Sequence, residues 1–212
     1  MDTGFLLTGF ILGFSIAAPV GPIGVLCIRR TLAEGMACGL ASGLGAATAD
    51  AAYGSIAGFG LVSVARFLVG HQAWLRFPGG AFLCYLGARA FLARPAPPAA
   101  PGTSSSRASR RRLTGAYAST LLLTLSNPLT IVSFAAAFSG LGLAAPGTAR
   151  GSAALLVAGV FSGSALWWLA LSGATSLLRS RLTARALRWV NRVSGLIILG
   201  FGLAVLLRPP GG

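Results

Sequence analysis

The sequence predicts an all-α integral membrane protein with six transmembrane helices, arranged as two inverted three-helix repeats. Three observations lead to this prediction. The 212 residues are 55% hydrophobic, with a mean hydropathy of +0.79, and 9% are charged, whereas a soluble domain carries roughly 25% charged residues. Six stretches are mostly apolar over the ~20 residues that a spanning helix needs. The arginines between these stretches are strongly biased toward one side of the membrane.

The six predicted spans have a similar apolar character, and their ends are approximate. The first follows Met-Asp-Thr, which carries no positive charge, and its apolar run is too long for a signal peptide, so we interpret it as a retained span. The predicted spans are residues 4–26, 37–62, 73–93, 113–140, 151–175 and 191–207.

Residues 94–112 (RPAPPAAPGTSSSRASRRR) differ sharply from the rest of the chain. Four prolines, five serines and threonines and a cluster of arginines cannot form a buried core, so we predict a flexible basic cytoplasmic linker. It separates a first three-helix repeat, residues 1–93, from a second, residues 113–212. Because each half has an odd number of spans, the two halves would have opposite orientations in the membrane.

The arginines predict the orientation of the chain. If the amino terminus is outside, 13 arginines fall in cytoplasmic connections and four in outside segments. This bias follows the positive-inside rule, and it predicts that both termini lie outside. Four of the cytoplasmic arginines have helical spacing and would form a lipid-facing basic stripe that binds anionic headgroups or simply stops transfer: Arg181, Arg185, Arg188 and Arg192.

Two segments interrupt the helical pattern. One contains Pro19, Gly21 and Pro22 in the first span, and the other contains Asn127 and Pro128 in the fourth. Proline removes a backbone donor and clashes with the preceding turn. The freed carbonyls must be satisfied again or face a cavity. Breaks at corresponding positions of two inverted halves indicate a transporter's central site, although a pair of harmless proline kinks is the alternative.

Asp50 is predicted to lie in the middle of the second span, with no basic residue within ten positions. A carboxylate at the bilayer centre costs ~2.5–3.5 kcal/mol on insertion scales, so it normally faces a cavity. Burial disfavours the charged form, which suits reversible protonation. Asp50 could instead bind Na⁺ or a substrate ammonium group. The alternative is a structural carboxylate that hydrogen-bonds Thr48 or a neighbouring helix. In the fifth span, the spacing of Gly159 and Gly163 predicts close helix packing.

Several classes of function are excluded. The net charge of +14 comes from arginines between apolar runs, which is not the continuous basic surface of a nucleic-acid-binding protein. The sequence has no acid pair, P-loop or nucleophile beside a histidine, so we predict no enzyme, no catalytic residues and no cofactor. Three isolated cysteines and one histidine do not predict a metal site, and we interpret them as buried hydrophobes and a loop residue: Cys27, Cys38, Cys84 and His71.

The chain resembles the lysine-exporter (LysE/RhtB-type) superfamily of bacterial exporters over nearly its whole length. The matching stretches are APVGPIGVLCIRRTLAEGMACGLASGLGAATADAAYG at 18–54, GGAFLCYLGARAFLAR at 79–94, SNPLTIVSF at 126–134 and NRVSGLIILGFGL at 191–203. Many amino-acid exporters of that family have lysine directly after the Asn-Pro pair, where this chain has Leu129. This departure bears on the substrate more than on the transporter class.

The resemblance implies secondary-active export of amino acids or related small metabolites across the bacterial cytoplasmic membrane. We expect cation-coupled alternating access, in which Asp50 binds the coupling proton or sodium ion, or the substrate amine. Thr48, Ser126, Asn127 and Thr130 would complete the binding site. Membrane lipids are expected partners, nucleic acid is not, and association into a homo-oligomer stays open. The alternatives are an inorganic-ion exporter or channel-like permease and a non-transporting membrane scaffold.

Overall fold

The computed structural model describes residues 3–59, 67, 70–93, 106–140, 150–179 and 182–207. The regular elements in these ranges are all α-helices, which confirms the predicted all-α class. They are α1 (Thr3–Ala17), α2 (Pro22–Glu34), α3 (Met36–Gly58), α5 (Gln72–Leu92), α6 (Ser106–Leu125), α7 (Pro128–Gly140), α8 (Arg150–Arg179) and α9 (Ala184–Leu207).

The number of membrane crossings stays a prediction. Among the described residues, two helices are long and apolar enough to span a bilayer, within α8 and α9. Two bent pairs would raise the number to four if each pair is one span. One pair is α1 and α2, bent by 80°, and the other is α6 and α7, bent by 63°. Helices α3 and α5 occupy the positions of the second and third predicted spans but do not meet the same criterion.

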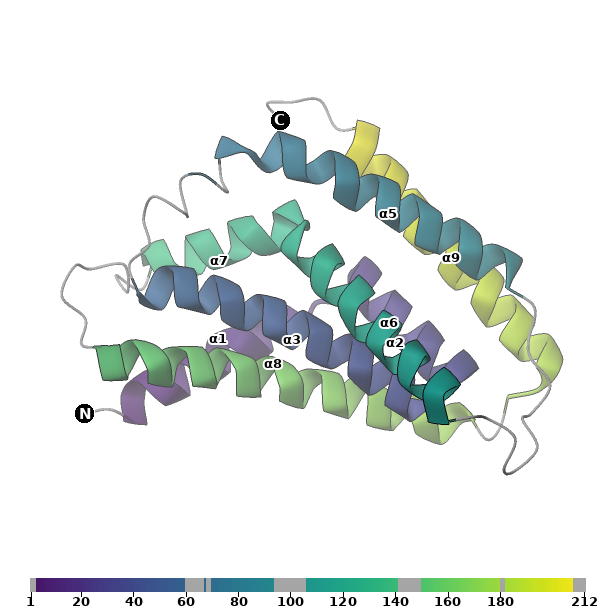
Figure 1. Cartoon of the computed structure of the whole chain (residues 1–212), viewed down its shortest axis with the longest axis horizontal. Coiled ribbons are helices and arrows are strands. Elements are labelled where there is room, and N and C mark those ends of the chain that lie inside the picture. The colour runs from purple at the N-terminus through teal and green to yellow at the C-terminus, as the bar shows by residue number, and fades with distance from the viewer. Residues whose placement is uncertain are drawn as a thin grey trace.

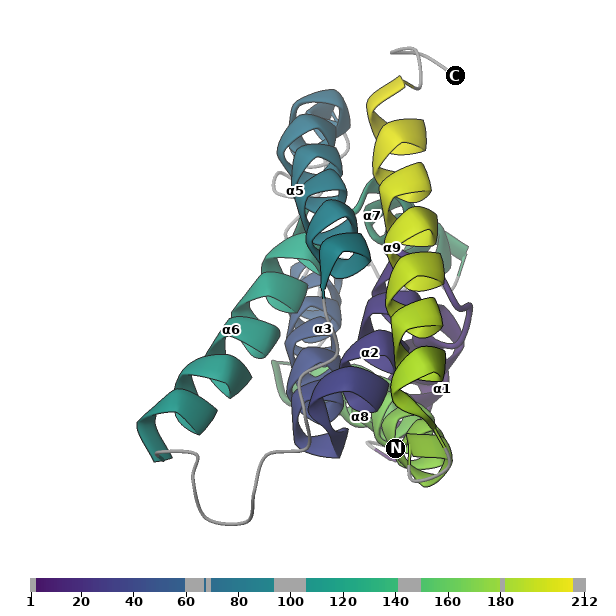
Figure 2. The same ribbon diagram turned by 90° about the vertical axis from the view of Figure 1, so that its right-hand side faces the viewer.

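The helices form two packed groups (Figure 1). Helix α8 packs against α1 and α3, and α3 also packs against α6. Helices α5 and α9 form an extensively packed pair at the opposite side of the molecule in both views (Figure 2). Helix α2 contacts α3, α8 and α9, so it connects the two groups.

Glycines bring the backbones of α1 and α8 into direct contact. Gly9 and Gly13 of α1 lie against the backbone of α8, and Gly159 and Gly163 of α8 lie against the backbone of α1. A Cβ atom at any of the four would clash with a carbonyl oxygen of the other helix. The close packing expected from the GxxxG spacing in the fifth span is therefore present, and α1 is the partner.

A second glycine contact joins α5 and α9. A Cβ atom at Gly87 would lie 2.9 Å from the carbonyl oxygen of Gly195, and one at Gly202 would lie 3.0 Å from that of Gly80. Both distances are shorter than side chains normally allow. The residue numbers run in opposite directions along the two helices, so α5 and α9 are antiparallel.

The first predicted span is divided at its expected break. Helix α1 ends at Ala17, and α2 continues to Glu34, beyond the predicted end of the span at residue 26. Arg29 and Arg30, which belong to the first of the predicted cytoplasmic connections, are therefore helical. After the 80° bend, α2 packs between other helices.

Helix α6 also begins before its predicted boundary. It starts at Ser106, whereas the fourth span was expected from residue 113. Arginine and alanine are favourable helix residues, which accounts for the added turns. Arg111 and Arg112 consequently lie on a helix rather than in connecting chain. The predicted linker residues 94–105 lie outside the described residues.

Candidate functional site

The first helix break lies between α1 and α2. The backbone N–H of Ala18 donates to the Phe14 carbonyl at 3.0 Å, which completes the last turn of α1. Gly21 then has an extended backbone, with φ −94° and ψ −163°. Pro22 follows as the first residue of α2, a position where proline's missing N–H removes no helical hydrogen bond. The expected break is therefore a sharp helix–extended–helix connection.

The second break lies between α6 and α7. Asn127 accepts a hydrogen bond on its side-chain Oδ1 from the backbone N–H of Leu129, at 3.1 Å. Its backbone carbonyl accepts from the N–H of Ile131 at 3.2 Å. Pro128 is the first residue of α7. An asparagine cap followed by proline is a favourable helix start, so Asn127 has a structural role at this break.

The two breaks meet at one small cavity of about 10 Å³. Pro22 comes from the first break, and Ser126 and Asn127 come from the second. Helix α5 closes the cavity, and a Cβ atom at Gly79 would lie 3.0 Å from the Ser126 Cβ. The volume corresponds to about one water molecule. Leu129, 69% exposed, is not among the lining residues.

Asp50 belongs to α3, is 4% exposed and lies at the contact of α3 with α8. The Ser164 hydroxyl of α8 donates to its Oδ2 at 2.7 Å. The Trp168 indole N–H in turn donates to the Ser164 oxygen at 3.1 Å. The carboxylate therefore accepts from a neighbouring helix, and its donor is oriented by a second group.

The other predicted polar residues lie at separate places. Thr48 donates to its own helix, at the Leu44 carbonyl, and accepts from the Tyr117 hydroxyl of α6 at 2.9 Å. Thr130 is buried on α7, 9% exposed. Ser126 and Asn127 therefore line the small cavity, whereas Thr48 lies at a separate contact between α3 and α6.

Tyr53 connects the Asp50 region to the second break. It lies three residues after Asp50, on the same side of α3. Its hydroxyl donates to the Leu125 carbonyl, the last residue of α6, at 2.6 Å. Its ring stacks on Phe134 of α7 with centroids 5.6 Å apart. Tyr53 therefore links α3 to the end of α6 and to α7 at the second break. The sequence analysis did not identify Tyr53.

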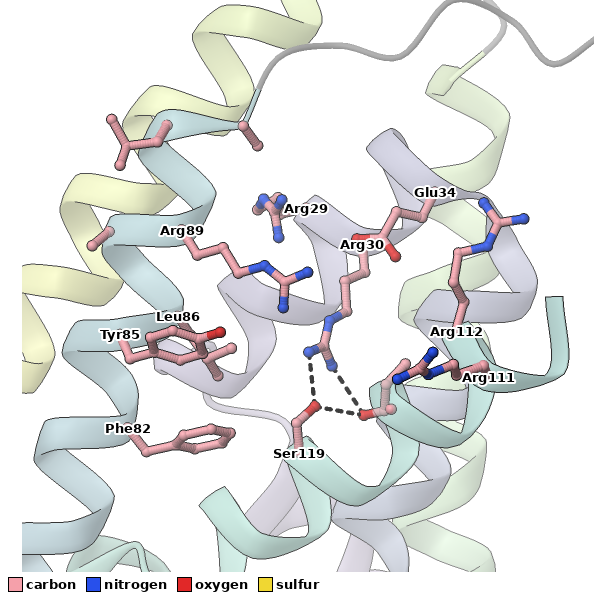
Figure 3. A pocket seen from close by; sticks show the side chains of 15 residues that line it. Arg29, Arg30, Glu34, Phe82, Tyr85, Leu86, Arg89, Arg111, Arg112 and Ser119 are labelled. Carbon is pink, nitrogen blue, oxygen red and sulfur yellow. Dashed lines mark hydrogen bonds between the residues drawn. The ribbon is translucent and has the colours of Figure 1, made fainter. Parts of the chain in front are cut away.

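A much larger cavity, of about 1160 Å³, lies between α2, α5 and α6. We call it the basic cavity. Figure 3 shows charged side chains from all three helices around it. Five arginines and one glutamate line it: Arg29, Arg30, Arg89, Arg111, Arg112 and Glu34. The sequence analysis used the arginines only for orientation and did not recognise that they surround one space.

Arg30 is the buried arginine of the cavity lining, with 7% of its surface exposed. Its guanidinium donates to the Ser42 hydroxyl at 2.8 Å, the Ser119 hydroxyl at 2.8 Å and the Thr120 hydroxyl at 2.9 Å. It also donates to the Ala116 carbonyl at 3.0 Å. All four acceptors are neutral oxygens on α3 and α6. Arg30 therefore joins α2 to α3 and α6 through four neutral acceptors.

Arg29 connects the cavity to α9. Its Nε donates to the Asn191 side-chain oxygen at 3.2 Å, and Asn191 donates to the Ala93 carbonyl at the end of α5, at 3.4 Å. Asn191 is 2% exposed. One buried amide thus ties together α2, α5 and α9. Arg29 and Asn191 both lie in stretches that carry the family resemblance, but nothing local indicates that they pair.

The basic cavity and the small cavity share the same three helices. The basic cavity is lined by residues 29, 30 and 34 of α2, by residues 82, 85, 86, 88, 89 and 92 of α5, and by residues 111, 112, 115, 116 and 119 of α6. The small cavity is lined by residues 22 and 23 of α2, 79 and 83 of α5 and 123 of α6, together with residues 126 and 127 of the second break and 205 of α9. Buried apolar side chains lie at this junction and belong to one core cluster: Ile23, Leu26, Leu83, Leu86 and Leu123. Leu86 borders the basic cavity, and Ile23, Leu83 and Leu123 border the small one. We call these apolar side chains the apolar barrier.

The predicted basic stripe is described in part. Arg185, Arg188 and Arg192 are exposed on α9, and Arg181 lies outside the described residues. Their role toward lipid stays a prediction. His71 is exposed and stacks on Phe67, with ring centroids 4.2 Å apart. Across the described residues, no group of three histidine, cysteine or acidic side chains could hold a metal ion.

Apolar helices, two helix breaks meeting at one cavity and a wide charged cavity beside them are features expected of a membrane translocator. Comparison with known proteins agrees. The family model described as "LysE type translocator" matches residues 14–208, and the chain belongs to this family. The chain is also similar to the "Putative amino acid efflux protein YcgF" of Bacillus subtilis (strain 168), with 30% identity over 200 residues, 92% of each chain. No solved structure matches.

Proposed function

We propose that this protein exports amino acids or related small metabolites across the bacterial cytoplasmic membrane by cation-coupled alternating access. Membership of the translocator family and the name of the Bacillus subtilis relative support an exporter of this substrate class. The observation that carries the proposal is the meeting of Pro22, Ser126 and Asn127 at one cavity. Broken helices that meet in this way place backbone dipole ends at a substrate site.

The helix directions support a transporter with two inverted three-helix repeats. Gly9 and Gly13 of α1 face Leu156 and Val160 of α8 in the same order, so these helices are parallel. Helices α5 and α9 are antiparallel. The first and fifth predicted spans would run in the same direction, and the third and sixth in opposite directions, as six alternating crossings require. Helix α1 of the first half packs against α8 of the second, and α6 of the second half packs against α3 of the first. This is the pattern expected if α1 corresponds to α6 and α3 corresponds to α8 in two equivalent halves.

The different sizes of the two cavities support a transporter that is open on one side. The basic cavity is large, whereas the space at the helix breaks holds about one water molecule. The arginines of the basic cavity belong to the segments predicted to be cytoplasmic. We therefore infer an inward-open state, in which the apolar barrier blocks the path beyond the basic cavity. Substrate would pass this barrier when Leu83 and Leu123 separate.

Asp50 is the proposed coupling residue. It is buried, and its hydrogen bond comes from the neutral Ser164 hydroxyl. A carboxylate held this way can take up a proton or a sodium ion without breaking a salt bridge. Tyr53, one turn along α3, bonds the carbonyl at the end of α6. Loading at Asp50 would thus be transmitted to the second helix break.

The test uses Asp50→Asn in cells and in proteoliposomes. Asparagine keeps the shape and can accept from Ser164, but it cannot take up a proton. We expect gradient-driven amino-acid transport to fall at least tenfold while substrate exchange without a gradient persists. The control Asp2→Asn removes another of the three carboxylates and should transport normally. Unchanged gradient-driven transport in Asp50→Asn would remove this residue from the mechanism. Wild-type vesicles that move no amino acid would contradict the export function.

A further inference from the structure

The charge of the basic cavity is strongly unbalanced. The lining residues carry five arginines and one glutamate, Glu34. Arg89, Arg111 and Arg112 are exposed, and Figure 3 shows Arg89 extending toward Arg30 across the cavity. A recess lined by one sign of charge concentrates counter-ions and repels ions of its own sign. A cationic solute would therefore be depleted in the basic cavity and an anionic solute enriched.

The chemistry of the lining also favours oxyanions. Guanidinium groups present planar forks of N–H donors that match carboxylate and phosphate oxygens. Arg30 is held rigidly by its four bonds to neutral oxygens, so its position does not depend on a bound anion. Exposed Arg89 and Arg112 can close on an anion from two other helices. The volume of about 1160 Å³ is sufficient for a small metabolite.

A single α-carboxylate would not balance this lining. An amino acid with a neutral side chain has no net charge, and one with a cationic side chain has a net positive charge. A second acidic group, either a carboxylate or a phosphate, would give the cargo net negative charge and occupy a second guanidinium. Helices α2, α5 and α6 line both cavities, so this cargo would pass along these helices from the basic cavity to the helix breaks.

We propose that the basic cavity is the entry site for an anionic cargo, a small metabolite with at least two acidic groups. This proposal rests on the proposed export function and specifies its substrate class. The headgroup of an anionic phospholipid has the same oxyanion chemistry and is the other source of a ligand here. The experiment must therefore separate a soluble anion from a lipid.

The first measurement is equilibrium binding by calorimetry to the full chain in phosphatidylcholine nanodiscs, which contain no anionic lipid. Two matched pairs of probes differ in one acidic group: L-glutamate against L-glutamine, and O-phosphoserine against L-serine. We expect at least one acidic probe to bind about tenfold or more tightly than its neutral partner, and L-lysine to bind most weakly. Equal affinity within both pairs would overturn the proposal.

The variants test whether the basic cavity is the binding site. Arg89→Gln and Arg112→Gln each remove one exposed charge and should weaken binding of the acidic probe about fivefold or more. Arg110→Gln is the matched control on α6, because Arg110 is exposed but does not line the cavity, and it should change affinity less than twofold. Glu34→Gln removes the acidic lining residue and should strengthen binding. Misfolding cannot produce this gain. Equal or weaker binding by a Glu34→Gln variant that keeps the melting temperature of the wild type would count against the proposal.

A lipid arm and a transport arm complete the test. In nanodiscs with phosphatidylglycerol, the acidic probe should still bind and still respond to Arg89→Gln. If that substitution affects only phosphatidylglycerol binding, the cavity is a headgroup site and the proposal fails. In vesicles, export of neutral or cationic amino acids that is insensitive to Arg89→Gln and Arg112→Gln would overturn the anionic cargo while leaving export intact. Acidic-probe binding without any vesicle transport would instead contradict the export function.

Discussion

Ser164 of α8 donates a 2.7 Å hydrogen bond to the buried carboxylate of Asp50 on α3. The two residues are 114 positions apart and belong to opposite halves of the chain. Ser164 is itself fully buried and accepts from Trp168. The bond therefore joins the two halves at Asp50, which is less exposed than Glu34, the other acidic residue that the structure describes. A change in the charge of Asp50 would alter this contact directly.

We predict that Ser164→Ala lowers both stability and coupled transport. The substitution leaves a buried carboxylate and the Trp168 N–H without this partner, which costs about 1–3 kcal/mol. Thermal unfolding in detergent, followed by tryptophan fluorescence, and transport in vesicles would measure the two effects. Ser162→Ala is the control, because Ser162 bonds only the Gly159 carbonyl of its own helix among the described residues. Equal behaviour of the two variants would count against a special role for the Ser164 bond.

We predict a large difference between two glycines of α8. A Cβ atom at Gly163 would clash with the backbone of Phe10, whereas one at Gly173 meets nothing within 4 Å. Gly163→Ala should therefore destabilise the α1–α8 contact by about 1–3 kcal/mol. Gly173→Ala should be neutral or slightly stabilising, because alanine favours helix more than glycine does. Comparison of the two melting temperatures in the same detergent is the test, and a similar loss in both would contradict the observed crossing.

Gly35, between α2 and α3, should be less replaceable than Gly21 at the helix break. Gly35 has φ +106° and ψ 164°, a conformation that is essentially restricted to glycine. Its backbone N–H also donates to the carbonyls of Arg30 and Thr31. Gly35→Ala should lower the free energy of unfolding by about 1–3 kcal/mol.

Gly21→Ala is the informative comparison for Gly35→Ala. Gly21 belongs to the most distinctive motif of the sequence, yet its φ of −94° suits any residue and a Cβ atom there has open space. Its substitution should leave the unfolding temperature nearly unchanged. If Gly21→Ala proves the more destabilising variant, the backbone described for these two turns is wrong.

The helix breaks and the burial of Asp50 could be predicted from the sequence because their causes are local. Proline restricts its own backbone and the residue before it, whatever the rest of the fold does. A lone carboxylate within a long apolar stretch must be buried or line a cavity. The all-α class follows in the same way from composition and the length of the apolar runs.

The partners of these residues could not be predicted, because they come from distant helices. Thr48 was expected near Asp50, but residues two apart on a helix do not face the same neighbour, and Thr48 instead accepts from Tyr117. Arg30 was counted only among the charges of a cytoplasmic connection. Its burial depends on the bend after α1 and on acceptors from α3 and α6. Neither condition is visible in the sequence around Arg30.

The orientation of the chain yields a last prediction, tested by single cysteines and a membrane-impermeant maleimide. Thr3 and Leu207 lie at exposed ends of α1 and α9. The variants Thr3→Cys and Leu207→Cys should react in intact spheroplasts, because both termini are predicted outside. The variants Arg110→Cys and Arg185→Cys should react only after permeabilisation. Each variant is made in a protein from which Cys84 has been removed. Cys27 and Cys38 can stay, because they are buried and should not react. If the Arg110→Cys variant reacts in intact spheroplasts, the basic cavity faces the outside of the cell. Anionic cargo would then meet this cavity from outside, which an exporter open to the cytoplasm does not permit.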